Sequence, residues 1–342
     1  MESDFLVRMS EQLRAQRRTL LEWLKGTPGA ARDLRLGTQP PEAVEAHVHV
    51  LEDAIARADA GELGRCTVCH EHVESHWLQM DYTTSVCIEH LTGEERSQLE
   101  AELELSQRVQ RALLPRETPS IPGFDVAAFS QPASIVGGDY FDFLRFADGV
   151  PAVIIADVMG KGMPASMLMA SLQAYLRVIL PESTSPADVL GRLNRLFCHN
   201  IQLTKFVSLV VARLTPKDGR FVYGNAGHHP PMLIRRGADG AAMAMLRPTG
   251  AAIGLVEGAI FAEAEAEMRR GDILIFYTDG VVEARDPEGR EFGDEGLGRY
   301  AGENRSAPPG PFVRGLRQRL QEFTAGRPLS DDTTIVAVRR LE

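Results

Sequence analysis

The chain has 342 residues, of which 44% are hydrophobic and 25% charged, a balance that is typical of soluble globular proteins and excludes a disordered or fibrous one. Its 47 acidic and 37 basic residues give a formal net charge of -10, so we do not expect a broad nucleic-acid-binding surface. No run reaches the ~18 consecutive apolar residues of a membrane span, and Asp, Glu and Arg stand among the first apolar residues, unlike in a signal peptide. We therefore expect a cytoplasmic protein of two or three domains with no membrane partner.

The N-terminal part of the sequence predicts a pair of helices. Apolar residues recur at helical spacing over residues 3–25 and again over residues 41–61, where gaps of 4, 3, 4 and 3 residues are those of a short coiled-coil seam. The Gly- and Pro-rich segment between the two stretches would be the turn of an antiparallel hairpin over residues 1–61. An ordinary helical bundle fits the same pattern equally well.

A third helix is expected to begin at Thr92, because Thr92 and Glu95 have the spacing of a capping box, and to end near Pro115. We assign residues 92–116 as a linker helix. Beyond it, short apolar or alternating runs separated by turn residues indicate strands, with antiparallel pairing because the loops are short. The expected strands are 151–156, 206–214, 221–225, 272–278 and 333–338, and the expected helices are 163–180, 185–200 and 311–324.

The cysteines predict a zinc site in residues 62–91. Two residues separate Cys66 from Cys69 and Cys87 from His90, and seventeen separate the two pairs. Two such turns can supply four tetrahedral zinc ligands, and the ion then replaces the hydrophobic core that a segment this short cannot build. The alternatives to His90 as a ligand are His70, His72 and His76.

The segment from IARADAGELGRCTVC to CIEH resembles the zinc finger of the DksA/TraR proteins, with His90 in place of the last cysteine. In that family a helical coiled coil enters RNA polymerase. Each predicted helix here has only about twenty residues, so RNA polymerase is a weaker candidate partner. The zinc ion could be purely structural, or its thiolates could make the module a redox or metal sensor. Cys198, far along the chain, is expected in the core.

Aspartates stand at the ends of several apolar runs. Asp157 follows AVIIA, Asp279 follows ILIFYT, and the doublet Asp331 and Asp332 precedes TTIVAV. A single aspartate at such a position is usually a turn former, but several carboxylates at one sheet edge repel one another unless a cation neutralises them. Oxygen ligands favour Mg²⁺ or Mn²⁺, and a pair of such ions can activate water for in-line attack on a phosphoryl group.

The segment VGGDYFDF adds two acidic residues to these candidates. Asp139 and Asp142 are three residues apart and would point to opposite faces of a strand, so we favour Asp139 as a metal ligand and expect Asp142 to bond to nearby backbone. The two glycines would let the backbone approach the site or form a bulge.

Several other polar residues are expected to play no catalytic part. We expect Lys161, in the turn GKG, to be solvated, and the histidines of NAGHHPP to be architectural, because two adjacent histidines cannot both point inward. Neither Ser208 nor Cys198 has an evident base partner, so no covalent nucleophile is expected.

The segments QRALLP, VGGDYFDF, ADVMGKGMPAS, FVSLVVARLT, NAGHHPP, FYTDGVVEAR and SDDTTIVAV occur in this order over residues 107–340. Together they resemble the SpoIIE-type branch of the metal-dependent PPM, or protein phosphatase 2C-like, serine/threonine phosphatases. The resemblance implies an α+β fold for residues 117–342, with a sandwich of two antiparallel sheets flanked by helices and two Mn²⁺ or Mg²⁺ ions at one edge. The implied metal ligands are Asp139, Asp157, the carbonyl of Val158, Asp279 and Asp331.

In this family pattern Asp157 would bridge the two ions, and Asp279 and Asp331 would hold the first. Asp139 would bind the second ion directly or through water, and Asp332 remains an alternative to Asp331. The leading hypothesis is therefore a cytoplasmic protein phosphatase for phosphoserine or phosphothreonine. The resemblance implies a substrate of the anti-sigma-factor antagonist kind.

The linker helix would pair into a homodimer and couple the zinc module to the phosphatase domain. A second hypothesis is a transcription regulator that binds RNA polymerase and uses a phosphatase-like domain to sense a ligand. A third is a hydrolase of a small phosphorylated metabolite.

Overall fold

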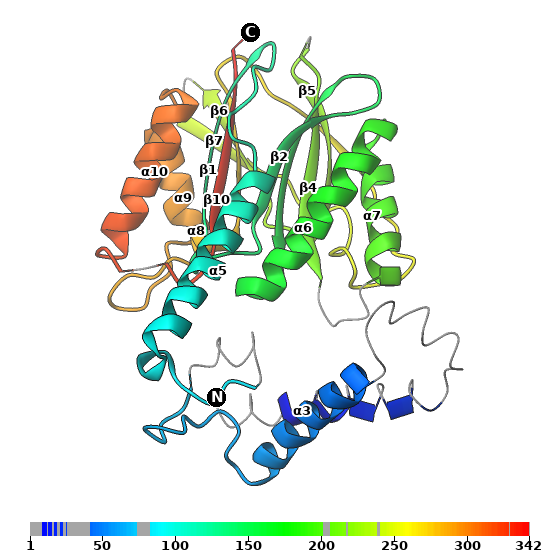
Figure 1. The fold of residues 1–342 in the computed structure, drawn as a ribbon. Coiled ribbons are helices and arrows are strands. Elements are labelled where there is room, and N and C mark those ends of the chain that lie inside the picture. The colour runs from blue at the N-terminus through cyan, green and yellow to red at the C-terminus, as the bar shows by residue number, and fades with distance from the viewer. Residues whose placement is uncertain are drawn as a thin grey trace. The chain divides into compact units, whose positions relative to one another are not determined.

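The computed structural model describes residues 9–11, 13–15, 17–18, 21–22, 25, 42–73, 83–200, 206–216, 218–237, 240–327 and 329–341. The chain divides into two compact units, Met1–Glu102 and Leu103–Glu342 (Figure 1). The finer boundaries expected from the sequence, after residues 61, 91 and 116, stay predictions.

In the first unit, the described residues between 9 and 25 that carry an assignment are helical, and helix α3 spans Glu42–Asp59. Arg14 pairs with Asp59, and Arg17 donates a hydrogen bond of 3.0 Å to Glu52, so the two helical segments run antiparallel. Their contact is apolar, with buried side chains of Leu13, Leu51, Ala54, Ile55 and Leu63. The pairing expected from the apolar stripes is therefore present, while the expected turn lies outside the described residues.

Helix α5, Gly93–Leu113, begins at the predicted capping box. The backbone N–H of Thr92 donates to Glu95 Oε2 over 2.9 Å, and the N–H of Glu95 donates to Thr92 Oγ1 over 3.2 Å. These two bonds satisfy N–H groups that have no partner inside the helix, which confirms the predicted start. The helix ends two residues before Pro115, which cannot continue it.

The second unit contains two five-stranded sheets with antiparallel neighbours throughout. The first sheet has the order β1 (Phe124–Gln131), β10 (Thr333–Arg340), β9 (Ile273–Tyr277), β6 (Met232–Gly237) and β7 (Gly240–Met245). The second has the order β2 (Tyr140–Arg145), β3 (Pro151–Val158), β4 (Val207–Leu214), β5 (Arg220–Ala226) and β8 (Ala264–Glu267).

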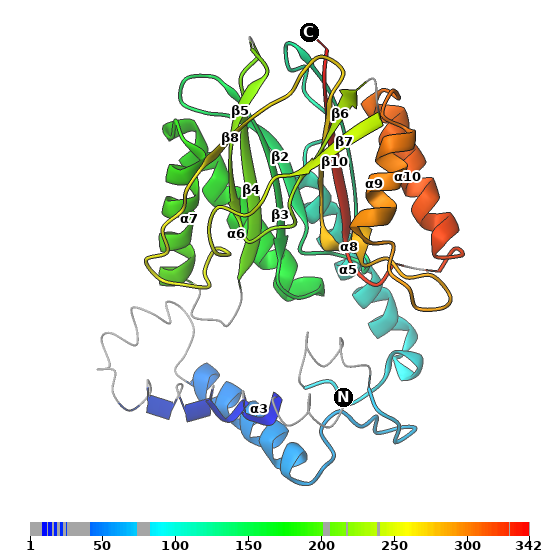
Figure 2. The same ribbon diagram turned by 180° about the vertical axis from the view of Figure 1, so that it is seen from behind.

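Helices cover the outer face of each sheet, as the two views in Figures 1 and 2 show. Against the second sheet lie α6 (Gly162–Ile179), the 3₁₀ turn η2 (Leu180–Glu182) and α7 (Pro186–Asn200). Against the first lie α8 (Asp279–Val282), α9 (Gly293–Glu303) and α10 (Pro309–Phe323). The fold class expected from the sequence, two antiparallel sheets flanked by helices, is confirmed.

The strands are apolar on both faces because both faces are covered. On β3, Val153 and Ile155 pack between the two sheets, whereas Ile154 and Ala156 pack beneath the helices. Successive strand residues point to opposite faces, so such a strand reads as an unbroken apolar run. Burial of each large aliphatic side chain contributes about 1.5–3 kcal/mol.

Several elements lack the pattern that would have predicted them. Strand β8 has the sequence AEAE, in which only the small residue alanine alternates with glutamate, and α8 is a single turn of four residues, too short to show a helical period. In the described part of the chain, one helical stretch, Gly162–Glu182, is long and apolar enough to cross a membrane by length and composition. Its side chains Met169, Leu172 and Leu176 are buried in the core of the second unit, as in the core helix of a globular domain.

Candidate metal centres

The two sheets bring the predicted carboxylates to one end of the sandwich. Asp139 directly precedes β2 and Asp157 lies near the end of β3, and these strands are antiparallel. In the same way Asp279 follows β9 and Asp331 precedes β10, which pair antiparallel in the other sheet. The start of one strand and the end of its antiparallel neighbour lie at the same end of a sheet, so each sheet presents acidic residues at that end.

The charges of these residues act on one another. Burial, followed by the charges of Asp279 and Asp331, raises the pKa of Asp157 to about 7. Burial and the charge of Asp157 raise the pKa of Asp139 well above its ordinary value. Carboxylates from four segments of the chain therefore repel one another in a partly buried site, and a divalent cation would relieve that repulsion.

Asp139 has an oxygen atom that lacks a hydrogen-bond partner in the described structure. Its side chain is buried, and Oδ2 accepts a hydrogen bond of 2.8 Å from Thr278 Oγ1, while Oδ1 is buried without a partner. Thr278 is itself fixed, because its Oγ1 accepts from the N–H of Thr334 over 2.9 Å. A buried carboxylate oxygen normally has a partner, so this one fits a cation ligand.

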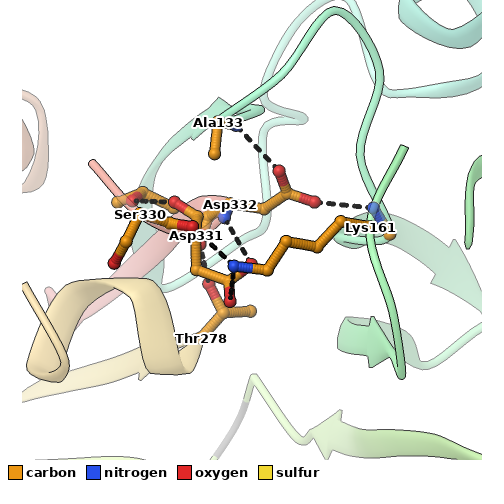
Figure 3. A network of polar contacts seen from close by, with 8 residues as sticks. Ala133, Lys161, Thr278, Ser330, Asp331 and Asp332 are labelled. Carbon is orange, nitrogen blue, oxygen red and sulfur yellow. Dashed lines mark hydrogen bonds and ion pairs between the residues drawn. The ribbon is translucent and has the colours of Figure 1, made fainter. Parts of the chain in front are cut away.

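The aspartate doublet is resolved by its contacts, which Figure 3 shows. Asp332 accepts backbone N–H groups on both oxygens, from Ala133 over 2.8 Å and from Gly138 over 2.6 Å. Asp331 Oδ2 instead lies 2.8 Å from Lys161 Nζ, which also donates to the carbonyl of Ser330 over 2.6 Å. The arrangement favours Asp331 as the metal ligand, although that choice stays a prediction. Lys161 is exposed to solvent, as expected, but its contacts with Asp331 and Ser330 were not predicted from the sequence.

The glycines of VGG lie where a side chain would collide with the site. A Cβ at Gly137 would lie 2.1 Å from Asp332 Oδ2, and one at Gly138 would lie 2.7 Å from the carbonyl oxygen of Val158. The expected close backbone approach is therefore confirmed. The side chain of Gln110 on α5 holds Gly137 from its other side: Nε2 donates to the Gly137 carbonyl over 2.5 Å, and Oε1 accepts its N–H over 3.1 Å.

Asp142 is separate from this cluster. Its carboxylate accepts hydrogen bonds from Tyr140 Oη over 2.7 Å and from the N–H of Phe143 over 2.8 Å. It also lies 3.1 Å from Arg177 Nη2. The expected bond of Asp142 to nearby backbone is confirmed, while Asp139 as a metal ligand stays a prediction.

Ser208 has a partner that sequence reasoning missed. Its Oγ lies 2.7 Å from Nδ1 of His228, whose Nε2 lies 3.1 Å from the carbonyl oxygen of Tyr277. Burial lowers the pKa of His228 to about 3, so the ring stays neutral at physiological pH and is a poor base. The pair links β4, β9 and the loop after β5, which is an architectural role.

The thiolate cluster forms as predicted. The ligand atoms of Cys66, Cys69, Cys87 and His90 all lie within 4.8 Å of one another. Cys87 Sγ is 3.0 Å from His90 Nδ1 and 3.9 Å from Cys69 Sγ, a spacing that fits four ligands around one zinc ion. His70 and His72 lie outside the cluster, and His76 lies outside the described residues.

Comparison with known proteins gives the family and the fold of this chain. Residues 147–341 match the family model described as Stage II sporulation protein E (SpoIIE). The chain belongs to the SpoIIE family. It is 28% identical over 250 residues to the phosphoserine phosphatase RsbU of Bacillus subtilis, with 72% of each chain covered. It is 29% identical over 266 residues to protein IcfG of Synechocystis, with 70% of this chain and 41% of the relative covered.

Solved structures support the fold of this SpoIIE-family member. The SiaA-PP2C domain of Pseudomonas aeruginosa matches with a TM-score of 0.64 and 20% identity, over 72% of this chain and 98% of that one. The RsbU and RsbW domains of Rv1364c from Mycobacterium tuberculosis match with a TM-score of 0.54 and 29% identity, over 65% and 61%. The expected PP2C-like fold and the expected enzyme class, a phosphatase of this family, are confirmed.

Proposed function

We propose that this SpoIIE-family protein is a metal-dependent phosphoserine and phosphothreonine phosphatase. The observation that carries the proposal is the convergence of Asp139, Asp157, Asp279 and Asp331 from four separate segments, with one buried oxygen lacking a partner. The name of RsbU, which is similar over 72% of this chain, supports phosphoserine as the substrate group.

The four aspartates, with the carbonyl of Val158, would hold two Mg²⁺ or Mn²⁺ ions. Bound there, such ions lower the pKa of water and offset charge on the phosphoryl oxygens. Other residues of the chain orient Asp139. Thr278 donates a hydrogen bond to one of its oxygens, and Asp332 accepts the N–H of Gly138 and so fixes the loop that precedes Asp139. The Lys161 ammonium group adds positive charge at the exposed rim of the site.

Phosphate release from a phosphoserine peptide, measured on the full-length protein with Mn²⁺, Mg²⁺ or a chelator, tests the proposal. We expect chelation to abolish activity, and Asp157→Asn and Asp279→Asn to lower it on the order of 100-fold or more. Asp139→Asn and Asp142→Asn form a matched pair, since both remove a buried carboxylate from the same segment. Loss of activity in the first and its retention in the second is expected, and turnover that is indifferent to ion removal would contradict the proposal.

For the substrate, we propose a phosphorylated regulatory protein of the anti-sigma-factor antagonist kind, in the cytoplasm. The similarity to RsbU and to the RsbU domain of Rv1364c supports it. A panel that compares phosphoproteins with small phosphorylated metabolites tests it. A preference for metabolites in kcat/KM would favour a metabolic hydrolase instead.

We also propose that α5 couples the zinc module, which resembles DksA/TraR zinc fingers, to the phosphatase unit of a homodimer. The contact of Gln110 with Gly137 supports the coupling, and the exposed apolar side chains of Leu105 and Val109, each 54% exposed, support pairing of α5 with a second copy. Leu105→Glu with Val109→Glu should convert a dimer to a monomer in analytical ultracentrifugation. A wild-type monomer at micromolar concentration would contradict the pairing.

A further inference from the structure

His229, Asp279 and Glu283 present three potential metal-binding atoms within 4.8 Å of one another. Asp279 begins α8 and Glu283 follows four residues later, and the N–H of Glu283 donates to the carbonyl of Asp279 over 2.8 Å. Residues four apart on a helical turn lie on the same face, so the two carboxylates point the same way. His229 reaches them from the loop that follows β5.

The orientation of His229 is set by its neighbour. His228 is held by Ser208 and by the carbonyl of Tyr277, and the His229 ring lies edge to face with the His228 ring at a centroid distance of 6.4 Å. The ring of His229 packs against the ring of Tyr277 with a centroid distance of 6.0 Å, which restricts its movement. In the described structure, neither the His229 ring nitrogens nor the Glu283 carboxylate make a hydrogen bond or an ion pair.

The charges around this cluster favour a cation. The carboxylates of Asp279 and Glu283 each place an oxygen within 4.8 Å of the other and of a His229 ring nitrogen. The donor set of one imidazole nitrogen and two carboxylates also differs from the oxygen-only set of the four aspartates. Imidazole binds borderline transition metals well, whereas Mg²⁺ prefers oxygen ligands and bound water.

We propose that His229, Asp279 and Glu283 form a further cation site, which takes a borderline divalent transition-metal ion in preference to Mg²⁺. Asp279 has two oxygens, so it can serve this site and the proposed binuclear centre together. The two sites are then neighbours with one shared ligand but with different metal preferences. The inference rests on the geometry of these three residues and not on phosphatase turnover.

Mn²⁺ is a suitable probe, because its electron spin detects directly coordinated nitrogen. We would load the thiolate cluster of the full-length protein with zinc, add Mn²⁺ in the presence of excess Mg²⁺, and record pulsed electron paramagnetic resonance spectra. Mg²⁺ should displace Mn²⁺ from oxygen-only sites, so the Mn²⁺ that remains should show coupling to the ¹⁴N nucleus of an imidazole.

Two variants test the ligands, and a third is their control. His229→Ala should abolish the nitrogen coupling and weaken the Mg²⁺-resistant binding of Mn²⁺ by roughly 10- to 100-fold. Glu283→Gln should weaken binding and keep the coupling. His199→Ala is the matched control, because His199 is an exposed histidine at the end of α7 and should change neither.

Absence of nitrogen coupling in the wild type, or its persistence in His229→Ala, would overturn the inference. The spectra report ligand identity without turnover, so a protein without phosphatase activity would still test this site. Conversely, metal-dependent phosphatase activity without nitrogen coupling would leave the binuclear centre standing and remove the further site alone.

Discussion

Replacement of Gln110 by alanine should loosen the metal-site loop from a distance. The Gln110 side chain is buried and makes two hydrogen bonds with the backbone of Gly137. The next residue, Gly138, donates its N–H to Asp332. A buried polar group left without its partner costs about 1–3 kcal/mol, and two groups of Gly137 lose theirs. Water that enters the vacated space would recover part of that loss, so we expect Gln110→Ala to lower the free energy of unfolding by about 2 kcal/mol.

Gln107→Ala is the matched control, one helical turn earlier. Gln107 is only partly buried and donates one solvent-exposed hydrogen bond of 3.3 Å to the carbonyl of Ile135, so its removal should change stability by less than about 0.5 kcal/mol. Urea unfolding followed by far-ultraviolet circular dichroism suits this measurement, because both tryptophans, Trp23 and Trp77, belong to the first unit and their fluorescence would not report the second.

The same pair of variants should differ in metal dependence. If Gln110 positions the loop that carries Asp139, Gln110→Ala should raise the Mn²⁺ concentration that gives half-maximal activity, and Gln107→Ala should not. Equal stability and equal Mn²⁺ dependence in the two variants would refute the reasoning, because they would show that the two bonds to Gly137 carry no more weight than one exposed contact.

Four further outcomes follow from the described contacts. Lys161→Met removes the cation beside Asp331, so divalent ions should bind about two- to fivefold more tightly in calorimetry, the range expected for an exposed ion pair of about 0.5–1 kcal/mol. Below pH 7, protons should compete with Mn²⁺ for Asp157, whose pKa is raised to about 7, so affinity should fall by up to about tenfold per pH unit. The metal-free protein should lose stability as the pH rises from about 4 to 7, because the raised carboxylate pKa makes the folded state bind more protons than the unfolded state. Cys87→Ser should remove bound zinc, measured by elemental analysis, without shifting the unfolding of the second unit.

Local signals in the sequence predicted local structure well. The capping box at Thr92 and Glu95 gave the start of α5, because both partners lie within one helical turn. The spacing of Cys66, Cys69 and Cys87 predicted the thiolate cluster, because short loops force such residues together. The apolar runs of β3 and β4 predicted strands because covered sheets leave no polar face.

Distant contacts decided what the sequence left open. Asp331 and Asp332 differ because the backbone N–H groups of Ala133 and Gly138 donate to Asp332. Both donors lie almost two hundred residues earlier in the chain. The two adjacent histidines of NAGHHPP likewise look equivalent in the sequence. Their different environments come from β4 and β9, so no local pattern could separate the buried His228 from the partly exposed His229.

The crowding at Gly137 has an evolutionary consequence. The carboxylate of Asp332 fills the volume that any side chain at position 137 would need, with 2.1 Å between the oxygen and the added carbon. A mutation to alanine at Gly137 should therefore be tolerated only in a lineage that has first shortened the residue at position 332. In homologues that have lost catalysis, a shorter residue at position 332 should therefore appear before alanine at position 137. A comparison of inactive homologous sequences would test this order.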